Sequence, residues 1–127
     1  MRLKEYFKQT KGVGVLATAD RDGNVDAALY ARPQILEDGT AAFIMHDRLT
    51  HHNLQSNPRA VYLFVEETTG YHGKRLFLYK TEEERNSDRI QSLRRRPHPS
   101  ENDQNVEPEF VVIFRVEKEL PLIGPSK

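Results

Sequence analysis

The sequence predicts a mainly β (α+β) fold in which six antiparallel strands form a barrel, with a few short helices beside it. Short runs rich in apolar, β-branched and aromatic residues recur along the chain, as in VGVLAT and AVYLFVEE. Most of these runs are joined by tight-turn sequences, among them Asp22-Gly23 and Asp38-Gly39. Short strands linked in this way are typical of antiparallel barrels.

The first half of the chain is predicted to hold two short helices and three strands. Leu3, Tyr6 and Phe7 lie at helical spacing, which predicts a helix over residues 2–10. Pro33 donates no ladder hydrogen bond, so its strand needs a bulge, an edge or a ligand at that point. The predicted strands cover residues 13–18, 25–36 and 41–46, with turns at 19–24 and 37–40 and a second helix at 50–56.

The second half is predicted to hold three strands and one longer helix. Thr81 and Glu84 form a capping-box pattern, which predicts a helix over residues 81–96. Arg94–Arg96 complement the dipole at its end, and Pro97 stops it. The strands cover residues 60–67, 73–80 and 109–119, and the polar segment 97–108 is expected to be a flexible loop.

The composition fits a single domain spanning residues 1–127. Nineteen basic residues balance nineteen acidic ones, so no global field favours nucleic acid or an anionic membrane as a partner. The absence of cysteine excludes disulfides, thiolate metal sites and a cysteine nucleophile. No apolar signal core or run of ~20 apolar residues occurs, so a soluble cytoplasmic protein is expected.

The stretch HDRLTHHNLQSNPRA concentrates histidines and arginines directly after an apolar strand. His46, His51 and His52 suggest a metal site at first sight. Adjacent histidines on a helix point about 100° apart, however, so only one of the last two can join His46. No further ligand pair completes the three or four ligands that zinc requires, and no metal is predicted.

An anion site uses more of the residues in this stretch. Thr50 is a good helix N-cap, which leaves the backbone N–H groups of residues 51–53 at the positive end of a helix dipole. Arg48 can donate two hydrogen bonds to a phosphate, and His51 one more. The alternative is a plain surface helix whose threonine caps itself, with Arg48 in solvent. The local sequence leaves both open.

Two other segments favour the anion site. Arg32 lies on a predicted strand next to Pro33, and Lys74 follows the glycine-rich sequence GYHG. Each segment alone fits an ordinary solvated strand or hairpin loop. Together with Arg48 they describe a pocket that holds a phosphate at one end and a flat ring at the other.

The order of these motifs resembles that of the pyridoxamine 5′-phosphate oxidase-like flavoproteins, the small FMN-binding split β-barrels. The matching features are the GVGVLAT strand, the Asp-Gly turn, Ala31-Arg32-Pro33, the Arg-x-Thr-x-x-Asn-Leu helix start, Asn-Pro-Arg-Ala and the Gly-Tyr-x-Gly loop. The resemblance covers residues 1–80 and extends to the final strand. It implies a six-stranded antiparallel split β-barrel with FMN as cofactor, in a homodimer that holds FMN at the subunit interface.

The resemblance also implies roles for residues of this chain. The phosphate is expected at Arg48, Thr50 and His51 with Arg32 nearby, and the ring along the backbone of 30–33 and 45–46. Thr50 stands where many relatives have lysine or histidine, so the phosphate contacts differ. The residues expected to bind the cofactor are Tyr30, Ala31, Arg32, Pro33, Met45, His46, Arg48, Thr50, His51 and Lys74.

The expected function is that of an FMN-binding oxidoreductase that passes electrons or hydride to an unidentified acceptor. The fuller signature of pyridoxamine phosphate oxidases is absent, so that reaction is not predicted. No catalytic residue stands out, although His46 and Tyr71 are candidates for the ring end. The alternatives are a non-catalytic flavin- or haem-binding module, and a deazaflavin in place of FMN.

Overall fold

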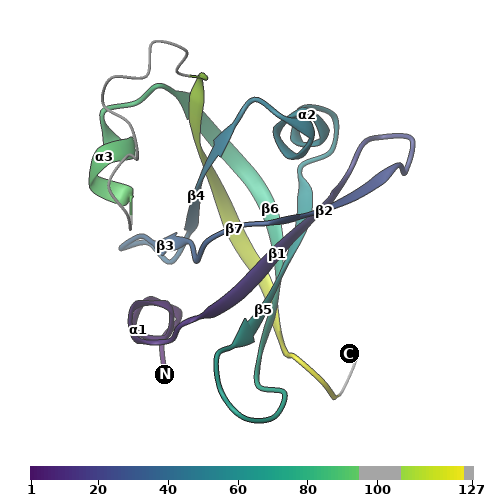
Figure 1. The fold of residues 1–127 in the computed structure, drawn as a ribbon. Helices are drawn as coiled ribbons and strands as arrows, with labels where there is room; N and C mark the ends of the chain where they lie inside the picture. Colours follow the sequence, from purple (N-terminus) through teal and green to yellow (C-terminus); the bar gives the residue numbers. More distant parts are fainter. Residues whose placement is uncertain (95–106, 125–127) are drawn as a thin grey trace.

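The computed structural model describes residues 1–94 and 107–124. Seven antiparallel strands form one curved sheet in the order β2-β1-β5-β6-β7-β4-β3, with three short helices around it (Figure 1). This confirms the predicted mainly β fold. The elements are α1 (Leu3–Gln9), β1 (Gly12–Ala19), β2 (Val25–Leu29), β3 (Gln34–Ile35), β4 (Ala41–His46), α2 (Leu49–Ser56), β5 (Arg59–Glu66), β6 (Gly73–Arg85), α3 (Arg89–Leu93) and β7 (Glu109–Pro121).

The second predicted strand is divided in the structure. Residues 25–29 form β2 at one edge of the sheet, and residues 34–35 form β3 at the other edge. The connection 30–33, which ends at the buried Pro33, therefore crosses from one edge to the other. β3 begins directly after Pro33, which has no N–H to donate, so the sheet pairing is interrupted at this proline as predicted.

Aromatic side chains fill the space inside the curved sheet. Phe7 of α1 is fully buried, and its ring lies edge-on to Phe64 of β5 with centroids 5.3 Å apart. Phe43 of β4 makes the same kind of contact with Phe114 of β7, at 5.6 Å. These pairs join α1 and strands from both halves of the chain into one core, beside which the connection 30–33 passes.

The predicted helix over residues 81–96 is wrong. β6 continues to Arg85 and pairs with β7, so that Arg85 lies opposite Phe110. Thr81 caps no helix; its hydroxyl donates to the carbonyl of Ile113 at 3.3 Å. Helical structure is limited to Arg89–Leu93. Residues 95–96, and 97–106 of the expected flexible loop, lie outside the described part of the chain.

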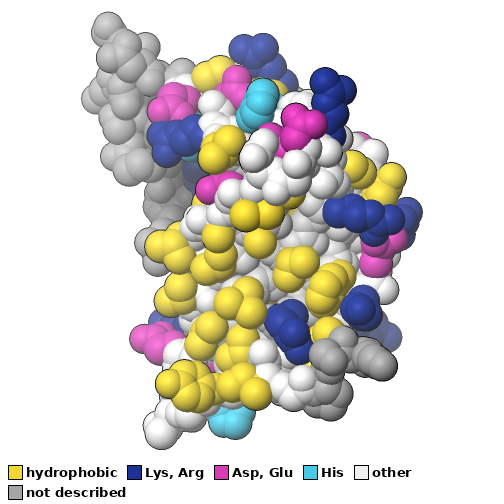
Figure 2. Space-filling view, turned by 90° about the vertical axis from the view of Figure 1, so that its right-hand side faces the viewer, with side chains coloured by type: hydrophobic (Ala, Val, Ile, Leu, Met, Phe, Trp, Pro, Cys, Tyr) yellow, Lys and Arg dark blue, Asp and Glu magenta, His cyan; other side chains and the backbone are white. Residues whose placement is uncertain are grey.

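The outer face of the sheet is apolar over β2, β1 and β5. Val15 lies between Leu29 and Leu63 in register, and the next row is Ala27, Ala17 and Val61. Leu29 is 75% exposed on the edge strand β2. Figure 2 shows hydrophobic side chains gathered over one side of the molecule.

Within residues 1–94 and 107–124, no helix has the length and apolar character needed to cross a membrane.

Candidate functional site

Two adjoining hollows lie beside the connection 30–33. The smaller one, about 490 Å³, is bordered by β2, β4 and the first turn of α2, and we call it the β2–β4 hollow. The larger one, about 830 Å³, extends from the same place toward α3 and the start of β7, and we call it the β4–β7 hollow. Tyr30, Ala31, Ile44 and His46 border both. Both volumes are in the range of small-molecule sites.

The structure brings most of the predicted cofactor residues together. Arg32 borders the β4–β7 hollow, whereas Pro33, His51 and Lys74 border neither. The predicted cofactor residues that border the β2–β4 hollow are Tyr30, Ala31, Met45, His46, Arg48 and Thr50. The ligand contacts of these residues stay a prediction.

The first turn of α2 differs from its predicted form. The helix begins at Leu49, and its N-cap is Arg48 in an extended conformation, without a side-chain cap. Thr50 is therefore inside the helix and not its cap, which corrects the sequence interpretation. The N–H groups of the first turn still lack partners within the helix, because every α-helix leaves its first N–H groups free of intrahelical bonds. The positive end of the dipole thus faces the β2–β4 hollow.

Two of the side chains predicted at the phosphate, Arg48 and Thr50, already contact carboxylates. Arg48 donates to Glu107 from Nε at 3.1 Å and from Nη2 at 2.7 Å. The guanidinium hydrogen bonds lower the pKa of the Glu107 carboxyl, and Glu107 raises the pKa of Arg48. The buried Thr50 directs its hydroxyl to Oδ2 of Asp26 at 3.4 Å. Asp26 and Glu107 were not among the predicted site residues.

Tyr30 spans the β2–β4 hollow. Its backbone N–H donates to the carbonyl of Gly14 at 3.0 Å, and its carbonyl accepts from the Tyr62 hydroxyl, also at 3.0 Å. Burial raises the pKa of the Tyr30 hydroxyl; a hydrogen bond with Thr50 lowers it, and the Asp26 charge raises it again. The phenol therefore lies close to both of these polar side chains.

His46 ends β4 between the two hollows. Its Nδ1 is buried and has no hydrogen-bond partner among the described residues. The nearest carboxylate oxygen, Oε2 of Glu107, is 3.6 Å away, which is too long for a hydrogen bond. Because Nδ1 itself is shielded from solvent, a ligand in either hollow would meet another part of this ring, whose side chain is 37% exposed.

His51 points away from the β2–β4 hollow and into the protein. Its ring stacks on Phe110 with centroids 3.9 Å apart. Nδ1 lies 2.9 Å from Asp47, and Nε2 lies 2.9 Å from Glu83 of β6. The ring therefore links α2 to β6. The sequence did not predict this link, because it places Glu83 in a helix.

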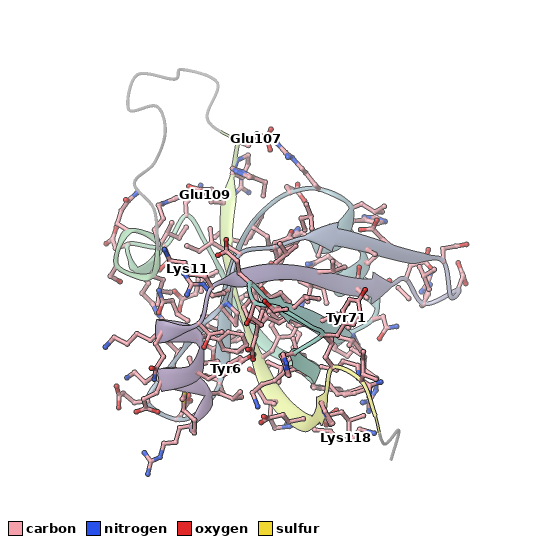
Figure 3. All side chains as sticks on the ribbon, turned by 60° about the horizontal axis from the view of Figure 1, so that its bottom comes forward. Tyr6, Lys11, Tyr71, Glu107, Glu109 and Lys118 are labelled. Atoms are coloured by element: carbon pink, nitrogen blue, oxygen red, sulfur yellow. The ribbon has the colours of Figure 1, made fainter. Side chains whose placement is uncertain are left out.

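Arg32 and Lys74 also have partners within the protein. Nη1 of Arg32 donates to the carbonyls of Phe7 and Thr10, both at 2.8 Å, at the end of α1. Lys74 pairs with Glu119, and its Nζ lies 4.8 Å from the centre of the Tyr6 ring. Figure 3 places Tyr6 well away from Glu107, the partner of Arg48, so Lys74 and Arg48 belong to different ends of the barrel.

No group of three or more histidine, aspartate or glutamate side chains in the described parts of the chain is arranged to hold a metal ion. The residues described above give the site hydrogen-bonding groups, apolar walls and the Arg48–Glu107 ion pair.

Comparisons with known proteins support the fold. No protein-family model matches the sequence, and no curated protein sequence matches it. Among solved structures, an FMN-binding protein from Syntrophomonas wolfei subsp. wolfei has a TM-score of 0.73 at 17% identity, over 98% of this chain and 86% of that one. HupZ of Group A Streptococcus has a TM-score of 0.68 at 18% identity, over 94% and 90%.

A third match is the putative pyridoxamine 5′-phosphate oxidase of Lactobacillus delbrueckii, with a TM-score of 0.66 at 16% identity, over 94% of this chain and 89% of that one. An F420 reductase and a haem-binding protein from Mycobacterium smegmatis match as well. The chain therefore has the split-barrel fold of the pyridoxamine 5′-phosphate oxidase-like proteins, a fold found in proteins named for FMN, F420 and haem.

Proposed function

We propose that the chain binds a flavin in the β2–β4 hollow and uses it to pass electrons or hydride to an acceptor. The observation that carries the proposal is the form of this hollow, about 490 Å³ with Ala28, Ile44 and Met45 in its wall. Hydrogen-bonding groups lie at one end, beside the first turn of α2. An apolar cleft with a few polar groups at one end suits a flat ring with a polar tail.

The ring and the phosphate of FMN fit this hollow to different degrees. The apolar wall and the backbone of residues 30–31 and 45–46 fit the isoalloxazine ring. The positive end of α2 fits an anion. The carboxylates of Asp26 and Glu107 oppose a phosphate, so FMN binding requires Arg48 to exchange Glu107 for the phosphate. FMN is the cofactor that the resemblance implies, and riboflavin has the same ring without this requirement.

The bound flavin supplies the redox chemistry, and the protein supplies placement. Tyr30 and His46 border the proposed ring position. Met45 and Ile44 exclude water from one side of the ring. These residues bind and orient the ring.

The proposal includes a homodimer with the flavin at the subunit interface. Leu29 belongs both to the wall of the β2–β4 hollow and to the apolar outer face of the sheet. A second copy that covers this face buries Leu29 and closes the hollow in the same step. Contiguous exposed apolar surface of this kind is typical of association sites, and homodimers with two-fold symmetry are the commonest assemblies.

The test is a visible-range spectrum of the purified protein, followed by titration of FMN and of riboflavin with flavin fluorescence as the readout. Bound flavin is expected to show quenched fluorescence and to be reduced by dithionite or by light while it stays bound. A colourless protein that quenches neither flavin contradicts the proposal.

Haem binding is the second candidate, because the partly exposed His46 borders both hollows and a haem-binding protein from Mycobacterium smegmatis has a similar fold. An imidazole in that position can serve as an axial ligand to haem iron. The expected result is a Soret band on haem titration that is lost in His46→Ala. The exposed His52 provides the matched control, and His52→Ala is expected to keep the band.

A further inference from the structure

We infer that Asp26 makes the β2–β4 hollow select a flavin whose tail carries hydroxyl groups without a terminal phosphate, so that riboflavin binds in preference to FMN. The inference rests on the proposed function and concerns the same site. It gives Asp26, which was not among the predicted site residues, a role in ligand specificity.

Asp26 faces the inner side of the sheet. In β2 it lies opposite Thr18 of β1, and Thr18 is buried and bonded to Asn53 of α2. The alternation of a strand places Asp26 and Ala28 on one face and the exposed Leu29 on the other. The Asp26 carboxylate is therefore held against the first turn of α2, where the phosphate of FMN was expected.

The contact with Thr50 shows how close Asp26 lies to the expected position of the FMN phosphate. Thr50 Oγ1 lies 3.4 Å from Oδ2 of Asp26. Thr50 is only 3% exposed, so its hydroxyl cannot turn to solvent and stays between Asp26 and Tyr30. An anion that accepts a hydrogen bond from Thr50 must therefore lie next to the Asp26 carboxylate.

The charges around the hollow do not compensate for this carboxylate. Arg48 is the one lysine or arginine among the described residues that border it. Glu107 already neutralises Arg48 through two hydrogen bonds. Asp26, Glu107 and Arg48 together carry a net charge of about −1, and a phosphomonoester adds about −1.5 to −2 at pH 7. Like charges within a few ångströms repel. Solvent screens part of this repulsion, since the side chains of Arg48 and Glu107 are 68% and 46% exposed.

The same groups suit a chain of hydroxyls. The Asp26 carboxylate accepts hydrogen bonds from hydroxyl donors, and an ionised acceptor makes such bonds shorter and stronger. Arg48 can donate to a hydroxyl oxygen from its remaining N–H groups without leaving Glu107. The ribityl chain of riboflavin offers several hydroxyls and no charge. The polar end of the hollow therefore complements a neutral polyol.

The experiment compares riboflavin and FMN binding to the full-length wild-type protein and to Asp26→Asn, by fluorescence titration at low ionic strength. Wild type is expected to bind riboflavin at least as tightly as FMN. Asp26→Asn keeps the size and the acceptor oxygen of the side chain, and it is expected to bind FMN about tenfold more tightly, with a change below about threefold for riboflavin. Salt at about 0.5 M is expected to reduce the difference between the flavins in wild type.

Two variants serve as controls. Asp22→Asn removes the same charge from the exposed turn between β1 and β2, and it is expected to leave the preference unchanged. Asp26→Glu keeps the charge and is expected to retain the riboflavin preference. If both flavins bind but Asp26→Asn leaves their ratio unchanged, or if wild type prefers FMN tenfold, the inference is overturned and the proposed function stands. If no variant binds either flavin, the proposed function fails and the inference with it.

Discussion

Nε2 of His51 lies 2.9 Å from Oε2 of Glu83, and this contact joins α2 to β6. Gln55 and Lys80 donate to the other oxygen of the same carboxylate at 3.0 and 3.1 Å. The first turn of α2, which borders the β2–β4 hollow, is thereby held to the central sheet. Glu83 is the shared acceptor of three side chains, so its ionisation controls how firmly the helix is held.

The first prediction concerns acid stability. Burial raises the pKa of Glu83, but hydrogen bonds from Gln55, His51 and Lys80 outweigh it and lower the pKa from 4.5 to about 2. Because the folded value lies below the unfolded one, the stabilisation is fully present above about pH 4.5 and is lost as the pH falls toward 2. Urea unfolding at a series of pH values is expected to show this loss in wild type.

Glu83→Gln provides the comparison, since it cannot ionise. Its free energy of unfolding is expected to be lower than that of wild type at pH 7 and to vary less across the same acidic window. Other carboxylates titrate in both proteins, so the difference between the two curves isolates Glu83. Glu82→Gln changes an exposed neighbour and should follow the wild-type curve. Parallel curves for wild type and Glu83→Gln would contradict the prediction.

The second prediction concerns the buried hydrogen bond beneath α2. Nδ2 of Asn53 donates to the hydroxyl of Thr18 at 3.1 Å, and both residues are buried. Thr18→Val keeps the shape of the side chain but leaves an amide N–H of Asn53 without this acceptor. We expect a loss of about 1–3 kcal/mol in the free energy of unfolding, measured in urea. Thr69→Val, in an exposed loop, should change it by less than about 0.5 kcal/mol.

The strands were predictable because they are short, apolar and separated by turn residues. The helix over 81–96 was wrong for a physical reason. A capping-box pattern at Thr81 and Glu84 is local, whereas β6 continues because its backbone pairs with β7 more than twenty residues further on. The register shift between Lys80 and Glu82 turns the glutamates of that segment so that Glu83 meets His51. Only the folded sheet brings these residues together.

Part of the candidate site was also predictable from the sequence. Arg48 and Thr50 were singled out because a helix start follows a strand end there, whereas Tyr30, Ala31, Met45 and His46 were implied by the family resemblance. Asp26 and Glu107 were missed because they come from β2 and from the segment before β7, and they reach the site only through the sheet. One signal for Asp26 existed: alternation in VDAAL places this carboxylate on the inward face with Ala28.

The third prediction separates two roles for Arg32. Its Nη1 donates to the carbonyls of Phe7 and Thr10, which lack helical partners at the end of α1. Arg32→Met keeps much of the apolar stem, and we expect it to lower the free energy of unfolding by about 1.5–3 kcal/mol. Flavin affinity should change by less than about threefold. A loss of flavin affinity with unchanged stability would place Arg32 at the ligand instead. Arg59→Met, at an exposed arginine, is the stability control.

The fourth prediction concerns the exchange of partners at Arg48. If a phosphate binds, it competes with Glu107 for the guanidinium. Arg48→Ala is expected to weaken FMN binding, because it removes a donor of charge-assisted hydrogen bonds, and to weaken riboflavin binding less. Glu107→Gln removes the competitor and should strengthen FMN binding. FMN affinities that are equal in wild type, Arg48→Ala and Glu107→Gln would remove this residue pair from the site.

The fifth prediction links the proposed homodimer to the β2–β4 hollow through Leu29. This side chain is 75% exposed on the edge strand β2, borders the hollow and lies in one row with Val15 and Leu63. A lysine at this position places a charge at the β2 edge of the apolar face, where a second copy that covers Leu29 would remove it from water. Leu29→Lys is therefore expected to be monomeric by light scattering, with its thermal unfolding within a few degrees of wild type at low protein concentration.

Flavin affinity supplies the second readout for the same variant. If the second copy closes the hollow, the monomer is expected to bind flavin at least tenfold more weakly than the wild-type dimer, because the open side of the ring stays in water. Ile123→Lys changes another exposed apolar residue away from β2 and should affect neither property. A monomeric Leu29→Lys with wild-type flavin affinity would show that one chain completes the site. A monomeric wild-type protein would show that the apolar face is not used for self-association.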